Sequence, residues 1–283
     1  MTYLANSAPT NGIRKRVTAP WVRAQKNLCK LSMLTAYDFA FATLLDRAGI
    51  DMLLVGDSLG PVIYGTPNTL SVTLDDILRH TRTVSSAATR ALVIADLPFL
   101  SYQVSLEQAV TNAGRCLKEA GAHAVKLEGG VEQTETIRAI VRAGIPVVAH
   151  IGLTPQSVHA VGGYRTYGKT EAERDLLLAD AKAVAEAGAF CVVLECVQEA
   201  TATEITKAIA VPTIGIGSGS NCDGQVLVTQ DLVGLTVGHV PKFVNPVADV
   251  AGIISAAAQS FVARMNDGEE SKPVVKGENV ISH

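Results

Sequence analysis

The sequence lacks the features of a membrane, secreted or nucleic-acid-binding protein. No apolar run reaches the roughly 18 residues that a bilayer-spanning helix needs. The polar start, Met1-Thr2-Tyr3-Leu4-Ala5-Asn6, is not a secretory signal. The formal net charge is only -3, with both signs mixed, so there is no basic stripe for nucleic acid or anionic membranes. Small molecules are therefore the expected partners.

The five cysteines also lack the spacing of a metal or disulfide site. They form no C-x-x-C pair and no ligand pattern with histidine, which argues against structural zinc and a disulfide framework. A reducing, cytoplasmic location fits this usage best. The residues before Asp38 carry bases but no acids, which leaves an organelle-targeting segment open as an alternative.

Hydrophobic residues make up 48% of the chain, enough for a large core, and they recur in a regular pattern. Short aliphatic and β-branched runs alternate with longer segments of helical period, which indicates βα units around a parallel sheet. The expected strands cover residues 31–34, 52–55, 92–95, 124–127, 146–149, 191–194, 212–215 and 226–228. Eight such strands predict an α/β fold, a single (β/α)8 TIM barrel.

Helices are expected between these strands, among them residues 106–120, 132–142, 172–187 and 203–209. Four helices are followed by Ala-Gly, where glycine can take the left-handed conformation that ends a helix: Gly49, Gly121, Gly144 and Gly188. The predicted organisation is an N-terminal extension over 1–25, a barrel domain over 26–265 and a polar, mobile tail over 266–283.

Acidic residues end four of the expected strands: Asp57, Asp96, Glu128 and Glu195. In TIM barrels the carboxyl ends of the strands form the active-site face. Any one of these acids could instead cap a turn or helix. Four together are harder to explain in that way. Carboxylates crowded at one mouth also repel each other by up to about 4 kcal/mol per pair. A positive partner is expected among them.

Lys126 is one such partner, since side chains alternate along a strand and it shares the inward face with Glu128. A single ammonium does not balance four acids, so a divalent cation is expected as well. Oxygen ligands favour Mg²⁺, whereas zinc would want sulfur or imidazole. The fifth strand ends in His150, to which the pattern assigns no role.

The segment 215–221, which follows the seventh strand, is rich in glycine. In barrels this region often holds phosphate. The segment lacks the spacing of a dinucleotide fingerprint, so close approach of the backbone is favoured over phosphate binding.

Several phrases, in order over about residues 31–243, closely resemble the ketopantoate hydroxymethyltransferase (3-methyl-2-oxobutanoate hydroxymethyltransferase) family. They are MLTAYD at 33–38, LVGDS at 54–58, ADLPF at 95–99, VKLEGG at 125–130, HIGLTPQS at 150–157, GIGSG at 215–219 and DGQ at 223–225. The resemblance implies a Mg²⁺-dependent enzyme of pantothenate biosynthesis, the route to coenzyme A. Such an enzyme moves a one-carbon unit from 5,10-methylenetetrahydrofolate to 3-methyl-2-oxobutanoate and forms 2-dehydropantoate.

The resemblance also implies roles for individual residues. Asp57, Asp96 and Glu128 would be metal ligands, direct or through water, and Glu195 would be the base that removes the C3 proton. The enolate formed would be held by Mg²⁺ and would attack the methylene carbon of the folate. The residues that would hold the oxo acid are Asp57, Ser58, Asp96 and Lys126. A cytoplasmic homodecamer is implied as well.

Two other functions fit a barrel of this kind. A carbon-carbon lyase or mutase of the isocitrate lyase and phosphoenolpyruvate mutase type would need a Lys-x-x-Cys-Gly-His segment, which this sequence lacks. A catalytically silent barrel would tolerate loss of the base, yet Glu195 is present.

Overall fold

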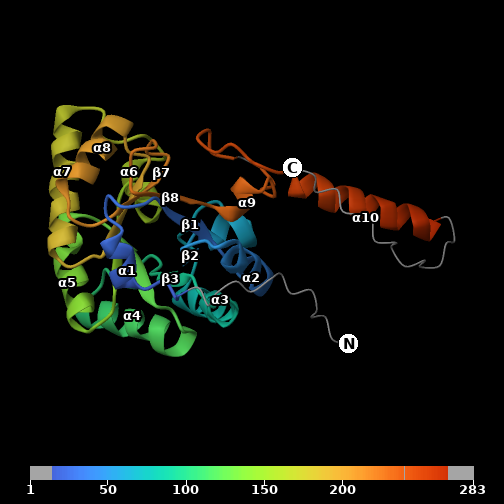
Figure 1. Cartoon of the computed structure of the whole chain (residues 1–283), viewed down its shortest axis with the longest axis horizontal. Helices are drawn as coiled ribbons and strands as arrows, with labels where there is room; N and C mark the ends of the chain where they lie inside the picture. The colour runs from blue at the N-terminus through green and yellow to red at the C-terminus, as the bar shows by residue number, and fades with distance from the viewer. Residues whose placement is uncertain (1–14, 239, 267–283) are drawn as a thin grey trace. The chain divides into compact units, whose positions relative to one another are not determined.

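The computed structural model describes residues 15–238 and 240–266. It contains a closed barrel of eight parallel strands joined in sequence order (Figure 1). The strands are β1 Leu31–Thr35, β2 Met52–Val55, β3 Leu92–Asp96, β4 Ala124–Glu128, β5 Val147–Gly152, β6 Cys191–Glu195, β7 Thr213–Ile216 and β8 Gly224–Leu227. All eight predicted strands and the TIM-barrel fold are confirmed.

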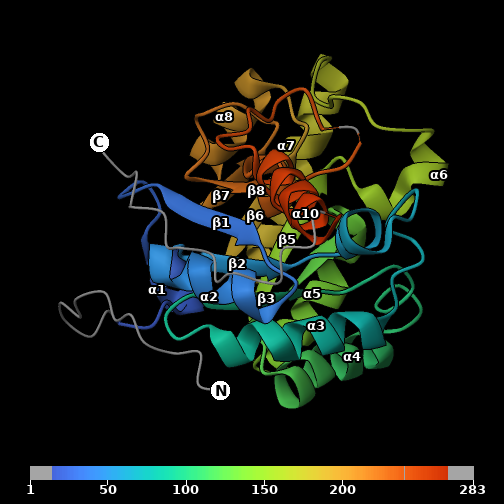
Figure 2. The ribbon, with the colours of Figure 1, turned by 90° about the vertical axis from the view of Figure 1, so that its right-hand side faces the viewer.

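Helices follow the strands and cover the outside of the sheet, as α3, α4 and α5 do in Figure 2. The helices are α1 Ala19–Ala24, α2 Phe39–Ala48, α3 Leu74–Ala87, α4 Leu106–Ala120, α5 Thr134–Arg142, α6 Val158–Val161, α7 Glu171–Glu186, α8 Glu199–Ala208, α9 Thr229–Leu232 and α10 Val250–Asn266. Short turns of other helical types are η1 Gly60–Tyr64, η2 Val131–Gln133 and η3 Pro155–Ser157. The four glycines of the Ala-Gly pairs have φ angles of 93°, 75°, 84° and 111°, as predicted.

The chain divides into two compact units, residues 1–229 and 230–283. The first contains all eight strands, and the second contains α10. Residues 1–14 of the predicted extension and 267–283 of the predicted tail lie outside the described residues. The predicted domain limits at 25 and 265 stay predictions. No helix among residues 15–238 and 240–266 is long and apolar enough to cross a membrane.

Two apolar layers hold the barrel together. The inner layer includes Met33, Met52 and Ile94, which fill the barrel, and it extends to Val17 and Val22 of the N-terminal segment. The outer layer, between strands and helices, includes Val125 and Leu127 of β4. Burial of each such side chain contributes roughly 1.5–3 kcal/mol. The alternation on β4 is therefore the predicted one, with Lys126 and Glu128 directed inward.

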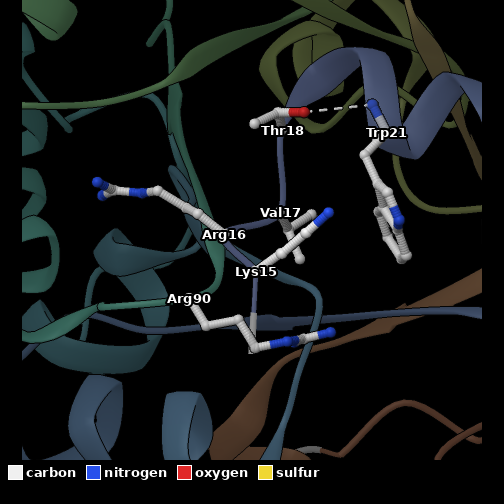
Figure 3. A pocket seen from close by; sticks show the side chains of 6 residues that line it. All are labelled: Lys15, Arg16, Val17, Thr18, Trp21 and Arg90. Atoms are coloured by element: carbon white, nitrogen blue, oxygen red, sulfur yellow. Dashed lines mark hydrogen bonds between the residues drawn. The ribbon is translucent and has the colours of Figure 1, made fainter. Parts of the chain in front are cut away.

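The N-terminal segment lies at the amino ends of the strands. The Val17 N–H donates to the carbonyl of Arg90, just before β3, at 2.8 Å. A pocket of about 470 Å³ lies beside it, with basic side chains and an indole in its lining: Lys15, Arg16, Val17, Thr18, Trp21 and Arg90 (Figure 3). Because this is the end of the barrel opposite to the strand-end acids, the pocket is separate from the candidate site.

Asp46 of α2 holds the turn that leads into β3. Its buried carboxylate accepts from the backbone N–H groups of Thr89, Arg90 and Ala91 and from the Thr89 hydroxyl. Burial opposes the charge, but these hydrogen bonds outweigh it and keep the pKa of Asp46 below its ordinary value. We expect Asp46→Asn to lower the free energy of unfolding by about 2–3 kcal/mol, as measured by urea titration. The NH₂ of the asparagine would face backbone N–H groups, which are donors as well.

This contribution should depend on pH. Since the pKa is lowered in the folded state, the stabilisation is complete above the unfolded value of about 3.9 and is lost as the pH falls through the folded-state pKa. The difference in the free energy of unfolding between wild type and Asp46→Asn should therefore be constant above about pH 5 and shrink below about pH 4. The exposed variant Asp75→Asn is the control, with an expected change within about 0.5 kcal/mol. A pH-independent difference would contradict an ionised Asp46.

Candidate active site

The strand register places oppositely charged residues side by side at the carboxyl ends of the strands. Asp96, the last residue of β3, is the register partner of Lys126 in β4. The Lys126 Nζ donates to both carboxylate oxygens of Asp96, at 2.8 and 2.7 Å, and both side chains are buried. The backbone N–H of Asp57, two residues beyond β2, donates to the same carboxylate at 3.2 Å. The structure thus brings three of the predicted site residues together.

The other two acids flank a histidine. Glu128 ends β4 and is the register partner of His150 in β5, whose Nδ1 lies 3.5 Å from Glu128 Oε1. The Nε2 of His150 lies 3.1 Å from Oε2 of Glu195, the last residue of β6. The Glu195 side chain is 19% exposed, against 5% or less for His150 and Glu128. Glu195 is therefore the carboxylate of this group that an entering substrate can reach.

Charge and burial shift the pKa values in this cluster. Burial disfavours the Lys126 ammonium, but Asp96, Asp57 and Glu128 outweigh it and raise the pKa of Lys126. Burial raises the pKa of Asp96 to about 6, against the opposing effect of Lys126. Burial and Lys126 oppose a charge on His150, yet Glu128 and Glu195 raise the pKa of His150 to about 9. At neutral pH His150 is a second cation.

This charge count corrects the sequence-based one, which included Lys126 alone. Beside Lys126, His150 is a second group that can carry positive charge among the four carboxylates, and its neighbours Glu128 and Glu195 favour that charge. The acids still outnumber these two groups. A divalent cation would match that remainder.

Ser58, predicted to contact substrate, is held by a residue that was not among the predicted site residues. The Tyr37 hydroxyl lies 2.7 Å from Ser58 Oγ, and the Tyr37 ring is buried. Burial raises the pKa of Tyr37, so its hydroxyl keeps its proton. Tyr37 lies in the MLTAYD phrase, but only the folded contact identifies it as the partner of Ser58.

The oxygen atoms of this cluster suit Mg²⁺. Within residues 15–238 and 240–266, no three His, Cys, Asp or Glu side chains lie close enough to hold a metal ion by themselves. Mg²⁺ commonly uses one or two carboxylates and keeps several waters. One buried oxygen, Glu128 Oε1, has no hydrogen-bond partner among the described residues. The donor set therefore fits Mg²⁺ with water in its shell, and the roles of Asp57, Asp96 and Glu128 as ligands stay a prediction.

The backbone around Glu195 is tightly constrained. A Cβ on Gly152, the register partner of Glu195, would lie 2.4 Å from the Glu195 carbonyl oxygen, and Gly152 has a φ of 96°. Cys196, the next residue after Glu195, takes a left-handed φ of 50°, which is rare for a residue with a side chain. Strained backbone of this kind is found where a fold fixes a functional side chain.

The glycine-rich segment packs against the side chain of Glu199. The Glu199 carboxylate, at the start of α8, accepts from the Ser220 N–H at 3.1 Å. A Cβ on Gly219 would lie 2.4 Å from Glu199 side-chain atoms. This is the close approach that the sequence favoured over phosphate binding.

Sequence comparison relates the chain to enzymes of one kind. Residues 16–270 match the family described as ketopantoate hydroxymethyltransferase. A 3-methyl-2-oxobutanoate hydroxymethyltransferase from Syntrophus aciditrophicus (strain SB) is 52% identical over 255 residues, which are 90% of this chain and 94% of that protein. One of the same name from Geobacter sulfurreducens is 54% identical over 240 residues, 85% of this chain and 90% of that protein.

Solved structures of more distant proteins share the fold. Phosphonopyruvate hydrolase has a TM-score of 0.60 at 15% identity, over 90% of this chain and 88% of its own. 2,3-Dimethylmalate lyase, of the phosphoenolpyruvate mutase and isocitrate lyase superfamily, has a TM-score of 0.59 at 19% identity, over 92% of both chains. At these identities the likeness shows the fold alone, so it does not favour the lyase or mutase alternative.

Proposed function

The chain belongs to the ketopantoate hydroxymethyltransferase family, and from this membership we propose that it converts 3-methyl-2-oxobutanoate to 2-dehydropantoate with 5,10-methylenetetrahydrofolate as the one-carbon donor. The observation that carries the proposal is the pairing of one open carboxylate, Glu195, with a buried Lys126–Asp96 pair at the same end of the barrel. One group can remove a proton while the other receives negative charge.

Lys126 and Ser58 are the groups that would hold the oxo acid. The Lys126 ammonium stays charged because three carboxylates surround it, so it can bind an anionic substrate and the charge that develops on the 2-oxo oxygen. The Ser58 hydroxyl, fixed by Tyr37, can donate to the substrate carboxylate. Together they would orient C3 of the substrate.

Glu195 would take the C3 proton. Its position on β6 is apart from the residues that would hold the oxo acid, Ser58 after β2 and Lys126 on β4, so it would approach C3 from a different side. His150, charged and 3.1 Å away, would orient this carboxylate. After the proton moves to Glu195, the electron pair at C3 attacks the methylene carbon of the folate as one of the two C–N bonds of the methylene bridge breaks. The second C–N bond then breaks and water adds its hydroxyl to the methylene carbon, which completes the hydroxymethyl group. The two folate nitrogens take up the C3 proton and the second proton of the water, and tetrahydrofolate leaves.

Asp57, Asp96 and Glu128 are the residues that would hold Mg²⁺, directly or through water. When bound, Mg²⁺ would act as a Lewis acid that polarises the 2-oxo group and makes the C3 proton easier to remove. The excess of carboxylates over Lys126 and His150 in the cluster supports this part of the proposal. The cytoplasmic homodecamer implied by the resemblance stays a prediction.

A direct assay tests the proposal. We expect the purified protein to form 2-dehydropantoate from 3-methyl-2-oxobutanoate and 5,10-methylenetetrahydrofolate in the presence of Mg²⁺. Addition of a chelator should abolish formation, and excess Mg²⁺ should restore it. Product formation that is indifferent to the chelator would contradict the metal, whereas absence of product with both substrates and Mg²⁺ would contradict the reaction.

A further inference from the structure

Gln156 contacts two of the candidate metal ligands at once. It lies in η3, in the loop after β5, and is 4% exposed. Its side-chain Nε2 donates to Asp57 Oδ2 and to the carbonyl of Leu97, both at 3.0 Å. Its backbone N–H donates to Glu128 Oε2, also at 3.0 Å. One residue of the β5 loop therefore links the carboxylate that follows β2 to the carboxylate that ends β4.

The amide of Gln156 has a single satisfactory orientation. Its Oε1 accepts from the hydroxyl of the buried Tyr102 at 2.9 Å, while both hydrogens of Nε2 have acceptors. Burial raises the pKa of Tyr102, so this hydroxyl keeps the proton that it donates. A flipped amide would direct its oxygen at the Asp57 carboxylate and the Leu97 carbonyl, which are both acceptors. The side chain is thus fixed at both ends.

These contacts divide each carboxylate into an occupied and an open oxygen. Oδ2 of Asp57 and Oε2 of Glu128 are held by Gln156. Oε1 of Glu128 is buried and has no hydrogen-bond partner among residues 15–238 and 240–266, although His150 Nδ1 lies 3.5 Å from it. Leaving a buried carboxylate oxygen without a partner is costly unless a ligand completes it. The oxygens that Gln156 does not bind, Oδ1 of Asp57 and Oε1 of Glu128, are the ones through which these carboxylates could bind a cation.

We propose that Gln156 is a positioning residue that restricts Asp57 and Glu128 to one coordinating oxygen each and thereby sets a preference for Mg²⁺ over Ca²⁺. The inference rests on the proposed function, because that function places a cation at these carboxylates. Mg²⁺ requires near-octahedral geometry with single oxygens from each ligand, whereas Ca²⁺ accepts six to eight oxygens and commonly takes both oxygens of a carboxylate. Holding the second oxygen in a hydrogen bond disfavours the larger ion.

The test is cation binding to the free protein, without substrate or turnover. Mn²⁺ is the probe, followed by electron paramagnetic resonance and displaced by Mg²⁺ or Ca²⁺. Gln156→Met keeps the length of the side chain but removes its donor. We expect Mn²⁺ affinity to fall by about tenfold, as loss of a hydrogen bond to a charged group predicts, and the Mg²⁺ to Ca²⁺ affinity ratio to fall by at least about tenfold.

Gln103→Met is the matched control, because Gln103 is exposed and does not contact Asp57 or Glu128: its Nε2 donates to Gln156 Oε1 and its Oε1 accepts from the Tyr102 N–H, both at 3.4 Å. It should leave the Mn²⁺ affinity and the Mg²⁺ to Ca²⁺ affinity ratio unchanged. Tyr102→Phe, which releases the other end of Gln156, should shift the ion preference in the same direction as Gln156→Met by a smaller factor. Unfolding midpoints of all variants separate a loss of fold from a loss of selectivity.

A folded Gln156→Met protein with wild-type Mn²⁺ affinity and ion preference would overturn the inference. If Gln156→Met does not fold, an unchanged ion preference in Tyr102→Phe would overturn it instead. Absence of Mn²⁺ binding to the wild-type protein would reject the metal site of the proposed function, and the Gln156 inference with it. A wild-type site that binds Mn²⁺ but does not depend on Gln156 would reject the inference alone.

Discussion

Replacing Glu195 by Gln should reduce exchange of the substrate C3 proton by about 10³-fold, within the range that general-base catalysis contributes. In heavy water with Mg²⁺ and 3-methyl-2-oxobutanoate but no folate, the wild-type protein should replace the C3 proton by deuterium, which nuclear magnetic resonance follows directly. The amide keeps the size of the carboxylate and can still accept from His150, 3.1 Å away in the wild type. The variant lacks only the capacity to take a proton.

Two measurements make this result specific. The dissociation constant of 3-methyl-2-oxobutanoate should stay within about threefold of wild type, because Glu195 is not among the groups proposed to hold the substrate. The exposed Glu186→Gln, at the end of α7, should exchange at the wild-type rate. Undiminished exchange in Glu195→Gln would remove Glu195 as the base.

Lys126→Met should give the largest combined loss of stability and activity. It leaves the Asp96 carboxylate buried, at 1% exposure, without the cation that binds both of its oxygens. Breaking one side of a buried ion pair costs about 3–5 kcal/mol. Loss of the ammonium should also reduce C3 exchange by about 10²- to 10³-fold, as removal of a group that stabilises developing charge does. Urea unfolding and the exchange assay measure the two effects separately.

A double variant distinguishes these two roles of Lys126. In Lys126→Met/Asp96→Asn the uncompensated charge is gone, so stability should recover by at least about 2 kcal/mol relative to Lys126→Met. Exchange should not recover, because neither the ammonium nor the carboxylate is present. Recovery of exchange together with stability would show that Lys126 matters only through folding.

The barrel could be predicted because its signals are local. Runs of aliphatic and β-branched residues identify strands, and glycines such as Gly121 end helices where a left-handed residue is needed. Details that depend on neighbours were missed. Strand β8 begins at Gly224, two residues before the predicted start. At this position β1 approaches so closely that only glycine fits, since a Cβ would lie 2.5 Å from the Leu31 carbonyl oxygen. Helix α8 begins at Glu199, four residues before its predicted start.

The charged residues of the site were predictable for a similar reason, since acids at the ends of parallel strands meet at one face of a barrel. Their partners were not. His150 becomes a cation only because the register sets it between Glu128 and Glu195, and neither the spacing nor the composition encodes that contact. Gln156 is polar, lies in a loop and resembles any exposed glutamine until the fold buries it against Asp57. Such roles follow from three-dimensional contact rather than from residue type.

The hydrocarbon layer inside the barrel has a consequence for the charges above it. Met33, Met52 and Ile94 belong to a continuous apolar filling that reaches Val17 and Val22 of the N-terminal segment. Beneath the carboxylates this filling is a medium of low dielectric constant, in which charges are screened much less than in water. Water and ions can then screen the negative field of Asp57, Asp96 and Glu128 only at the open mouth of the barrel. Cations are drawn in from that side only, and a polar residue introduced at Met52 would weaken their attraction without touching one of the acids.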